Sequence, residues 1–181
     1  MHNKYYILLI TCVIVIILMF YNTKEYKLKK KYDNNYKLIE LRSFSKKFMN
    51  YLNRLCTSNE VKNKDYYNSL IKLINTYDDN RLYENKNVID KSKTSYTTDK
   101  GKVIKLCLDG DINILKHVLL HEMAHIMCES IGHTKEFWEK FKYISIKANE
   151  SGLYQLVDFK YSPQYYCGTK IHYNPVYDYN R

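Results

Sequence analysis

Short cysteine spacings are absent from this chain of 181 residues, although it contains five cysteines. Cys12 lies in an apolar stretch, and the other four are far apart in the sequence, so none of the cysteine patterns of structural zinc sites occurs. In a cytosolic protein these cysteines would be reduced, small apolar residues, whereas their even number would allow disulfides in an exported protein. The four are Cys56, Cys107, Cys128 and Cys167.

Zinc fingers, groove-reading motifs and internal repeats are absent as well. The chain therefore lacks the usual sequence signatures of a DNA-reading protein and of a repeat protein. Its length is sufficient for one domain with its own core.

Proline and glycine are also missing between Ile112 and Cys128. This absence favours one continuous helix, and Asp111 or Asn113 can cap its start. Apolar residues surround all but one stripe of this helix, which predicts a buried helix whose polar stripe faces a cleft. The apolar residues are Ile112, Leu115, Leu119, Met123, Ile126 and Met127.

The polar stripe carries His121, Glu122 and His125 in a His-Glu-x-x-His pattern. Residues four apart lie above one another on a helix, so both imidazoles can reach one metal ion. Glu122 lies on the flank of that face, where it can reach a metal-bound water without becoming a ligand. Zinc lowers the pKa of such a water to about 7, so a carboxylate can take its proton near neutrality. The alternative is two core histidines and a surface acid, which would fit an otherwise apolar helix poorly.

A catalytic zinc ion needs a third protein ligand and one open position. The stripe continues to His117 on one side and to Glu129 on the other, but groups eight residues apart are separated by about 12 Å along a straight helix. The third ligand must therefore come from beyond a turn. His117 could replace His125 only by abandoning the geometry of Glu122, so we expect it further along the cleft.

The residues after the helix offer such a turn. Gly132 is a helix stop, His133 follows at once, and Thr134 can cap a second helix from Lys135 to about Lys147. We therefore predict His133 as the third zinc ligand. His172 is the alternative, and Glu129 is a weaker one.

Residues 67–168, and most specifically Val103 to Phe141, resemble the SprT-like and WLM group of zinc metalloproteases. In that group the His-Glu-x-x-His motif is followed by a histidine and, a few residues on, by Phe-Trp or Phe-Tyr, as by Phe137-Trp138 here. The step from His125 to His133 is slightly longer than is common in WLM members, and the metzincin spacing is not met. The resemblance implies zinc on His121, His125 and His133, with Glu122 as the catalytic base.

The resemblance also implies the fold class, a small zincin-like α+β domain that is mostly helical with a short sheet. Apolar spacing predicts amphipathic helices at 38–55 and 66–77, and a strand is predicted at 102–108. Residues 80–99 are expected to be loop or short strand, and those after Ser151 an irregular segment. In the family the strand before the zinc helix commonly lies at the cleft edge, where an extended peptide could add to it.

An apolar stretch from Ile7 to Phe20 precedes this domain. With the tyrosines that flank it, the stretch reaches the minimum length of a transmembrane helix. A cleaved signal peptide is the alternative, but no small-residue cleavage site follows. We therefore predict a single-pass anchor at 1–22, a basic juxtamembrane linker at 23–35 and a zinc metallopeptidase domain at 36–181.

Basic residues are concentrated behind the apolar stretch. Five lysines lie between Lys24 and Lys31, and the positive-inside rule predicts from them a cytoplasmic catalytic domain on a host or virion membrane. The net charge is +10, and nine basic against three acidic residues lie between Lys24 and Lys47. This segment would attract anionic lipid head groups, and nucleic acid is the alternative partner because the resembled families often act on DNA-bound proteins. The abundance of Lys, Asn, Ile and Tyr also fits an AT-rich genome.

The sequence thus predicts a membrane-anchored zinc metallopeptidase that hydrolyses peptide bonds in a protein or peptide substrate, with Zn²⁺ as its cofactor. Two alternatives are kept. One is a non-catalytic, zinc-stabilised membrane or virion structural protein, and the other is a protease that acts on nucleic-acid-bound proteins.

Overall fold

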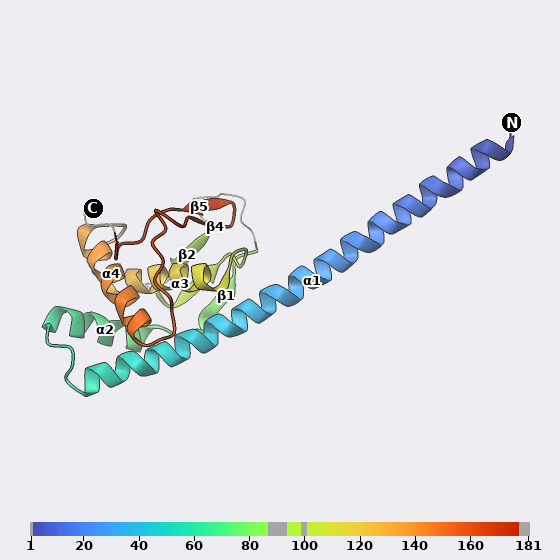
Figure 1. Cartoon of the computed structure of the whole chain (residues 1–181). Helices are drawn as coiled ribbons and strands as arrows, with labels where there is room; N and C mark the ends of the chain where they lie inside the picture. Colours follow the sequence, from blue (N-terminus) through green and yellow to red (C-terminus); the bar gives the residue numbers. More distant parts are fainter. Residues whose placement is uncertain (1, 87–93, 99–100, 178–181) are drawn as a thin grey trace. The chain divides into compact units, whose positions relative to one another are not determined.

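The computed structural model describes residues 2–86, 94–98 and 101–177, with side chains from residue 10 onward (Figure 1). Within these residues the chain is mostly helical, with two small sheets. The helices are α1 (His2–Thr57), α2 (Lys64–Thr76), α3 (Ile112–Met127) and α4 (Lys135–Glu150), with a 3-10 turn at Asp79–Arg81. The strands are β1 (Leu82–Glu84), β2 (Ser95–Thr98), β3 (Val103–Leu106), β4 (Gln164–Tyr166) and β5 (Thr169–Ile171).

By its packing the chain divides into residues 1–36 and residues 37–181. The second unit contains the core, and α3 packs there against α2, α4 and both sheets. Leu119, Leu120, Met123 and Ala124 of α3 are completely buried. Helix α1 covers this core with a stripe at helical spacing, which consists of Leu41, Phe44, Phe48, Leu52 and Leu55.

The predicted helices of this unit are confirmed. Helix α2 begins at an Asn63 cap, whose side chain accepts hydrogen bonds from the N–H groups of residues 65 and 66. Asp111, one of the two predicted caps, accepts a hydrogen bond from the N–H of Asn113 and starts α3. Thr134 caps α4 as predicted.

Strand β3 lies in the centre of the three-stranded sheet, whose order is β1-β3-β2. It pairs in parallel with β1, where Ile104 lies opposite Leu82, and antiparallel with β2, where Ile104 lies opposite Thr97. The expectation that this strand lies at the cleft edge is therefore wrong, because both of its edges are occupied. The two edge strands of this described sheet are β1 and β2, and both lie within the segment 80–99.

The prediction of a membrane-spanning helix at the start of the fold is wrong. No helix within the described residues is both long and apolar enough to cross a membrane. The apolar residues 7–20 span about 21 Å at about 1.5 Å per residue, whereas the hydrocarbon core of a bilayer is about 30 Å thick. Helix α1 continues without a break from this run through the lysine-rich residues 23–35, which were expected to be a linker. The single-pass localisation and the membrane as partner, which depended on this helix, are not supported.

A disulfide joins Cys107, just after β3, to Cys167, between β4 and β5. Cys56 and Cys128 are buried and free, and Cys12 is exposed and free. The disulfide holds the two-stranded hairpin to the end of the larger sheet, and the backbone N–H of Cys167 donates to the carbonyl of Asp109 at 2.9 Å beside it.

Candidate metal centre

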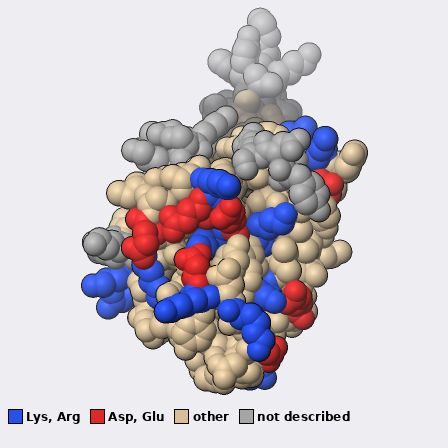
Figure 2. Space-filling model, turned by 90° about the vertical axis from the view of Figure 1, so that its left-hand side faces the viewer, with Lys and Arg blue, Asp and Glu red and all other residues tan. Residues whose placement is uncertain are grey.

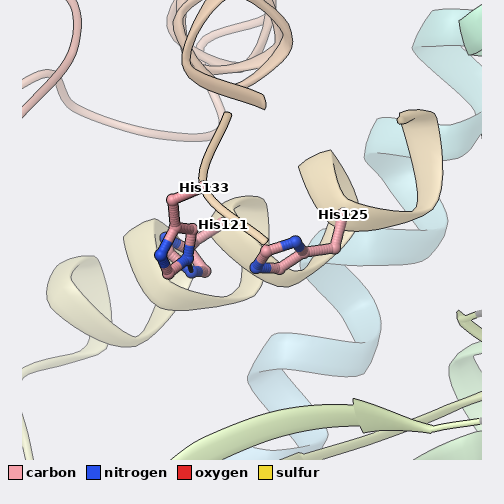
Figure 3. A group of neighbouring side chains, drawn as sticks. All are labelled: His121, His125 and His133. Atoms are coloured by element: carbon pink, nitrogen blue, oxygen red, sulfur yellow. Dashed lines mark hydrogen bonds between the residues drawn. The ribbon is translucent and has the colours of Figure 1, made fainter. Parts of the chain in front are cut away.

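The three predicted histidines lie together (Figure 3). His121 and His125 project from one face of α3, and His133 approaches them from the loop before α4. One ring nitrogen of each lies within 4.8 Å of those of the other two, and the Nε2 atoms of His121 and His133 are 3.0 Å apart. A tetrahedral zinc ion with bonds of 2.0–2.1 Å needs ligand nitrogens about 3.3 Å apart. The cluster therefore fits such an ion after small side-chain adjustments.

The electrostatic environment keeps these imidazoles neutral, as metal ligands must be. Burial lowers the pKa of His121 well below its ordinary value, and the neighbouring histidines lower it further. Burial, with a contribution from His133, lowers the pKa of His125 to about 4. Burial also lowers the pKa of His133. Three neutral imidazoles match the ligand set of a catalytic zinc site that keeps its fourth position open.

The ring of Phe137 packs against the three histidines. This residue of α4 is completely buried, and its ring centroid lies 4.8 Å from that of His121, 4.3 Å from that of His125 and 4.6 Å from that of His133. The Phe137 that marks the family resemblance in the sequence thus contacts all three candidate ligands. This contact restricts the imidazoles to few orientations because the rings are packed on one side.

Glu122 follows His121 on α3 and is only 3 % exposed. Its Oε2 accepts a hydrogen bond of 2.5 Å from the hydroxyl of Thr97 on β2. Burial raises the pKa of the Glu122 carboxyl, and the hydroxyls of Thr97 and Ser95 oppose this shift by hydrogen bonding to it. Ser95 and Thr97 are two apart on one strand, so they share a face of the sheet and reach the same carboxyl.

A cleft of about 680 Å³ runs past Glu122 and the two histidines of α3. One wall is β2 with the residue before it, 94–97, and the other is the loop 128–133. A second cavity of about 230 Å³ shares His121 and residues 94–95 with it, and six of its lining residues are aromatic or aliphatic. They are Val118, Trp138, Phe141, Tyr166, Ile171 and Tyr173.

The alternative ligands lie outside the three-histidine cluster. His172 is exposed, with Nδ1 3.4 Å from the carbonyl of Lys170, and it lines the second cavity. His117 is buried, and its Nδ1 lies 3.0 Å from the hydroxyl of Tyr154. Glu129 forms an ion pair with Lys72 at 2.8 Å. Among the described residues, the structure thus gathers the three histidines of the first prediction.

Sequence reasoning missed the two hydroxyls of β2. The alternation of Ser95 and Thr97 on one strand face was a signal, but the surrounding segment is polar and gave no reason to place it beside α3. Only the pairing of β2 with β3 brings it there.

No protein-family model matches this chain, and no solved structure matches it. The chain is 38 % identical over 97 residues to an uncharacterized protein of Acanthamoeba polyphaga mimivirus, which covers 50 % of this chain and 48 % of the relative. It is 34 % identical over 87 residues to an uncharacterized protein of Invertebrate iridescent virus 6, covering 40 % of this chain and 48 % of the relative. A protein of Invertebrate iridescent virus 3 with the same description is 35 % identical over 75 residues, covering 38 % and 46 %. The chain spans about half the length of these curated viral relatives. Because no family model matches, its resemblance to the SprT-like and WLM proteases stays a prediction.

Proposed function

We propose that this chain is a zinc metallopeptidase that hydrolyses peptide bonds. The observation that carries the proposal is the meeting of three imidazoles with a buried carboxyl in one open cleft. This set of groups matches the requirements of zinc-assisted hydrolysis, namely three neutral ligands, an open position and a base beside it.

His121, His125 and His133 would hold the ion, which when bound activates a water and polarises the scissile carbonyl. Glu122 takes the proton of the attacking water and then gives it to the amine that leaves. The hydroxyls of Thr97 and Ser95 hydrogen-bond to this carboxyl and hold it in one orientation.

An extended peptide is the substrate that suits the cleft best. The wall of the cleft includes β2, an edge strand of the described sheet, and a peptide can add to such an edge through backbone hydrogen bonds. The apolar second cavity beside His121 can then receive a side chain of that peptide. These features support a peptide substrate over a small molecule.

The test is a Glu122→Gln variant, which removes the base but keeps the size of the side chain. We expect the zinc content to stay at the wild-type level while cleavage of a peptide library falls by about 10²–10⁴-fold, the usual contribution of a general base. Zinc content and digestion products are measured on the zinc-loaded full chain. Cleavage by this variant at the wild-type rate would refute the proposed mechanism.

The two alternatives have less support. A structural zinc site fills all four positions with protein groups, whereas three such groups come together in the part of the chain that the structure describes. The other alternative is a protease that acts on nucleic-acid-bound proteins, and a basic patch would be its electrostatic sign. On the face drawn in Figure 2, basic and acidic side chains lie interspersed. Neither observation favours an alternative over the peptidase.

A further inference from the structure

The loop 128–134 between α3 and α4 delivers His133 to the cluster, and its own backbone gives it little rigidity. Gly132 has a positive φ of 85°, and nothing lies within 4 Å of the point where its Cβ would be. Ile131 is 97 % exposed. A loop with an open side and a glycine next to the candidate ligand needs other contacts to hold His133 in place.

Glu136, in the first turn of α4, supplies such contacts. Its Oε1 accepts a hydrogen bond of 3.0 Å from the backbone N–H of Glu129. Its Oε2 accepts one of 3.1 Å from the backbone N–H of Ser130 and one of 2.6 Å from the Ser130 hydroxyl. The Ser130 hydroxyl and the backbone N–H groups lower the pKa of this carboxyl, so that it is ionised near neutrality. Hydrogen bonds to an ionised acceptor are about twice as strong as neutral ones.

These bonds connect the two ends of the loop. The hydroxyl of Ser130 also lies 2.7 Å from that of Thr134, which in turn accepts a hydrogen bond from the N–H of Phe137 at the start of α4. A continuous chain of hydrogen bonds therefore runs from the residues just after α3 to the residue just after His133. The carboxylate of Glu136 is the acceptor at its centre.

A second tie comes from α2. The ammonium group of Lys72 donates to the carbonyl of Cys128 at 2.7 Å and pairs with the Glu129 carboxylate at 2.8 Å. The beginning of the loop is thus fixed from two sides. Glu136, which follows His133 by three residues, connects this beginning to α4, and the contact between the hydroxyls of Ser130 and Thr134 connects it to the residue after His133. Glu136 itself is outside the group of candidate metal ligands.

We propose that Glu136 is a positioning residue of the metal centre, whose carboxylate holds the loop 128–134 so that His133 meets His121 and His125 before metal binds. This inference rests on the proposed zinc site. Without the carboxylate the loop has to become ordered when zinc binds. The conformational entropy lost in that step lowers the affinity for zinc.

The experiment measures zinc affinity of the full chain by competition with a chelator. We expect Glu136→Ala and Glu136→Gln to bind zinc about 10–100-fold more weakly than wild type, the usual effect of removing a group that orients a metal ligand. Glu139→Gln is the matched control, because it removes the same charge from an exposed position of the same helix. Its zinc affinity should stay within about threefold of wild type.

A double-mutant cycle separates positioning from a general effect on the fold. If Glu136 acts through His133, then Glu136→Gln changes the zinc affinity of a His133→Ala chain by less than about threefold. The thermal unfolding midpoint of each metal-free variant is measured beside it. The N–H groups that Glu136 leaves behind are on an exposed or half-buried loop and can bond to water, so the variants should fold.

Two results would overturn this inference while leaving the zinc site intact. One is zinc binding by both Glu136 variants within threefold of wild type. The other is an equal loss of affinity from Glu136→Gln with and without His133, which would mean that the residue acts on the fold as a whole. A wild-type chain that binds no zinc would instead refute the metal centre itself, and this inference with it.

Discussion

Glu122 combines a buried position with a carboxyl that the proposed mechanism needs in its charged form. Burial raises its pKa, and the hydroxyls of Ser95 and Thr97 work against that shift. The hydrogen bond from Thr97 also fixes which oxygen is engaged. A base that is already oriented does not lose time or energy to reorientation in the transition state.

Thr97 can be tested with a pair of opposed substitutions. We predict that Thr97→Val, which keeps the shape but removes the hydroxyl, lowers kcat about tenfold or more, with KM and zinc affinity little changed. Thr97→Ser, which keeps the hydroxyl but loses the methyl group, should stay within about threefold of wild type. Steady-state kinetics on a cleaved peptide measures both. Equal activity of the two variants would show that the hydroxyl has no role.

His117 predicts a pH dependence of stability. Burial among Phe141, Tyr154 and Phe159 lowers the pKa of its imidazole to about 3, against about 6.5 in the unfolded chain. Between these values the unfolded state binds the extra proton, so this residue destabilises the fold as the pH falls from 6.5 towards 3. The slope is at most about 1.4 kcal/mol per pH unit for one such group.

We therefore expect His117→Gln to lose less stability than wild type between pH 7 and pH 5. Urea unfolding of the metal-free chains at both pH values measures the difference, and the other histidines contribute equally to both proteins. Parallel losses in the two chains would contradict the neutral, buried state of His117.

The three candidate ligands could be predicted from the sequence because they lie close together in it. The four-residue step between His121 and His125 sets one helix face, and Gly132 before His133 indicates a return of the chain. The contacts of Phe137, Thr97 and Glu136 were not predicted, because each depends on how separate elements pack. Residue spacing carries no information on such contacts.

Strand β2 lies at the cleft, a position that was predicted for the strand at 102–108. The strand at 102–108 was the stronger pattern, and β3 confirms it as a strand, but its apolar residues place it in the middle of the sheet. The more polar β2 occupies the edge, as strands with one solvated side do. Hydrophobic periodicity identifies a strand but not its order in the sheet.

The disulfide between Cys107 and Cys167 joins the hairpin of β4 and β5 to the end of β3. The bond closes a loop of 60 residues, for which the chain-entropy relation gives a stabilisation of about 4 kcal/mol. The free cysteines could not be told from the paired ones in the sequence, because the pairing joins segments far apart. Residues 169–173 of the hairpin and after it line the second cavity.

We predict that a reducing agent lowers the unfolding free energy of the wild-type chain by about 2–4 kcal/mol. Denaturant unfolding with and without a dithiol measures this change. A chain with Cys107→Ser and Cys167→Ser should unfold alike under both conditions, which controls for the free Cys56 and Cys128. Identical wild-type curves with and without the dithiol would mean that this disulfide does not form.

At the scale of the whole molecule, the prediction of a membrane anchor relied too heavily on the apolar residues 7–20. As a helix, these residues are shorter than the hydrocarbon core of a bilayer is thick. No helix among the described residues could cross a membrane. The second unit, residues 37–181, holds the core, the sheets and the three histidines. The similarity of the chain to viral proteins extends over about half of their length and is not accompanied by a functional description.

The proposed function requires that three imidazoles of this chain bind one zinc ion and leave a position open. X-ray absorption at the zinc edge of the zinc-loaded full chain tests it most directly. We expect three imidazole nitrogens at about 2.0–2.1 Å and one further oxygen ligand, and a His133→Ala chain should show one imidazole fewer. A sulfur ligand at about 2.3 Å, or a chain that retains no zinc, would contradict it.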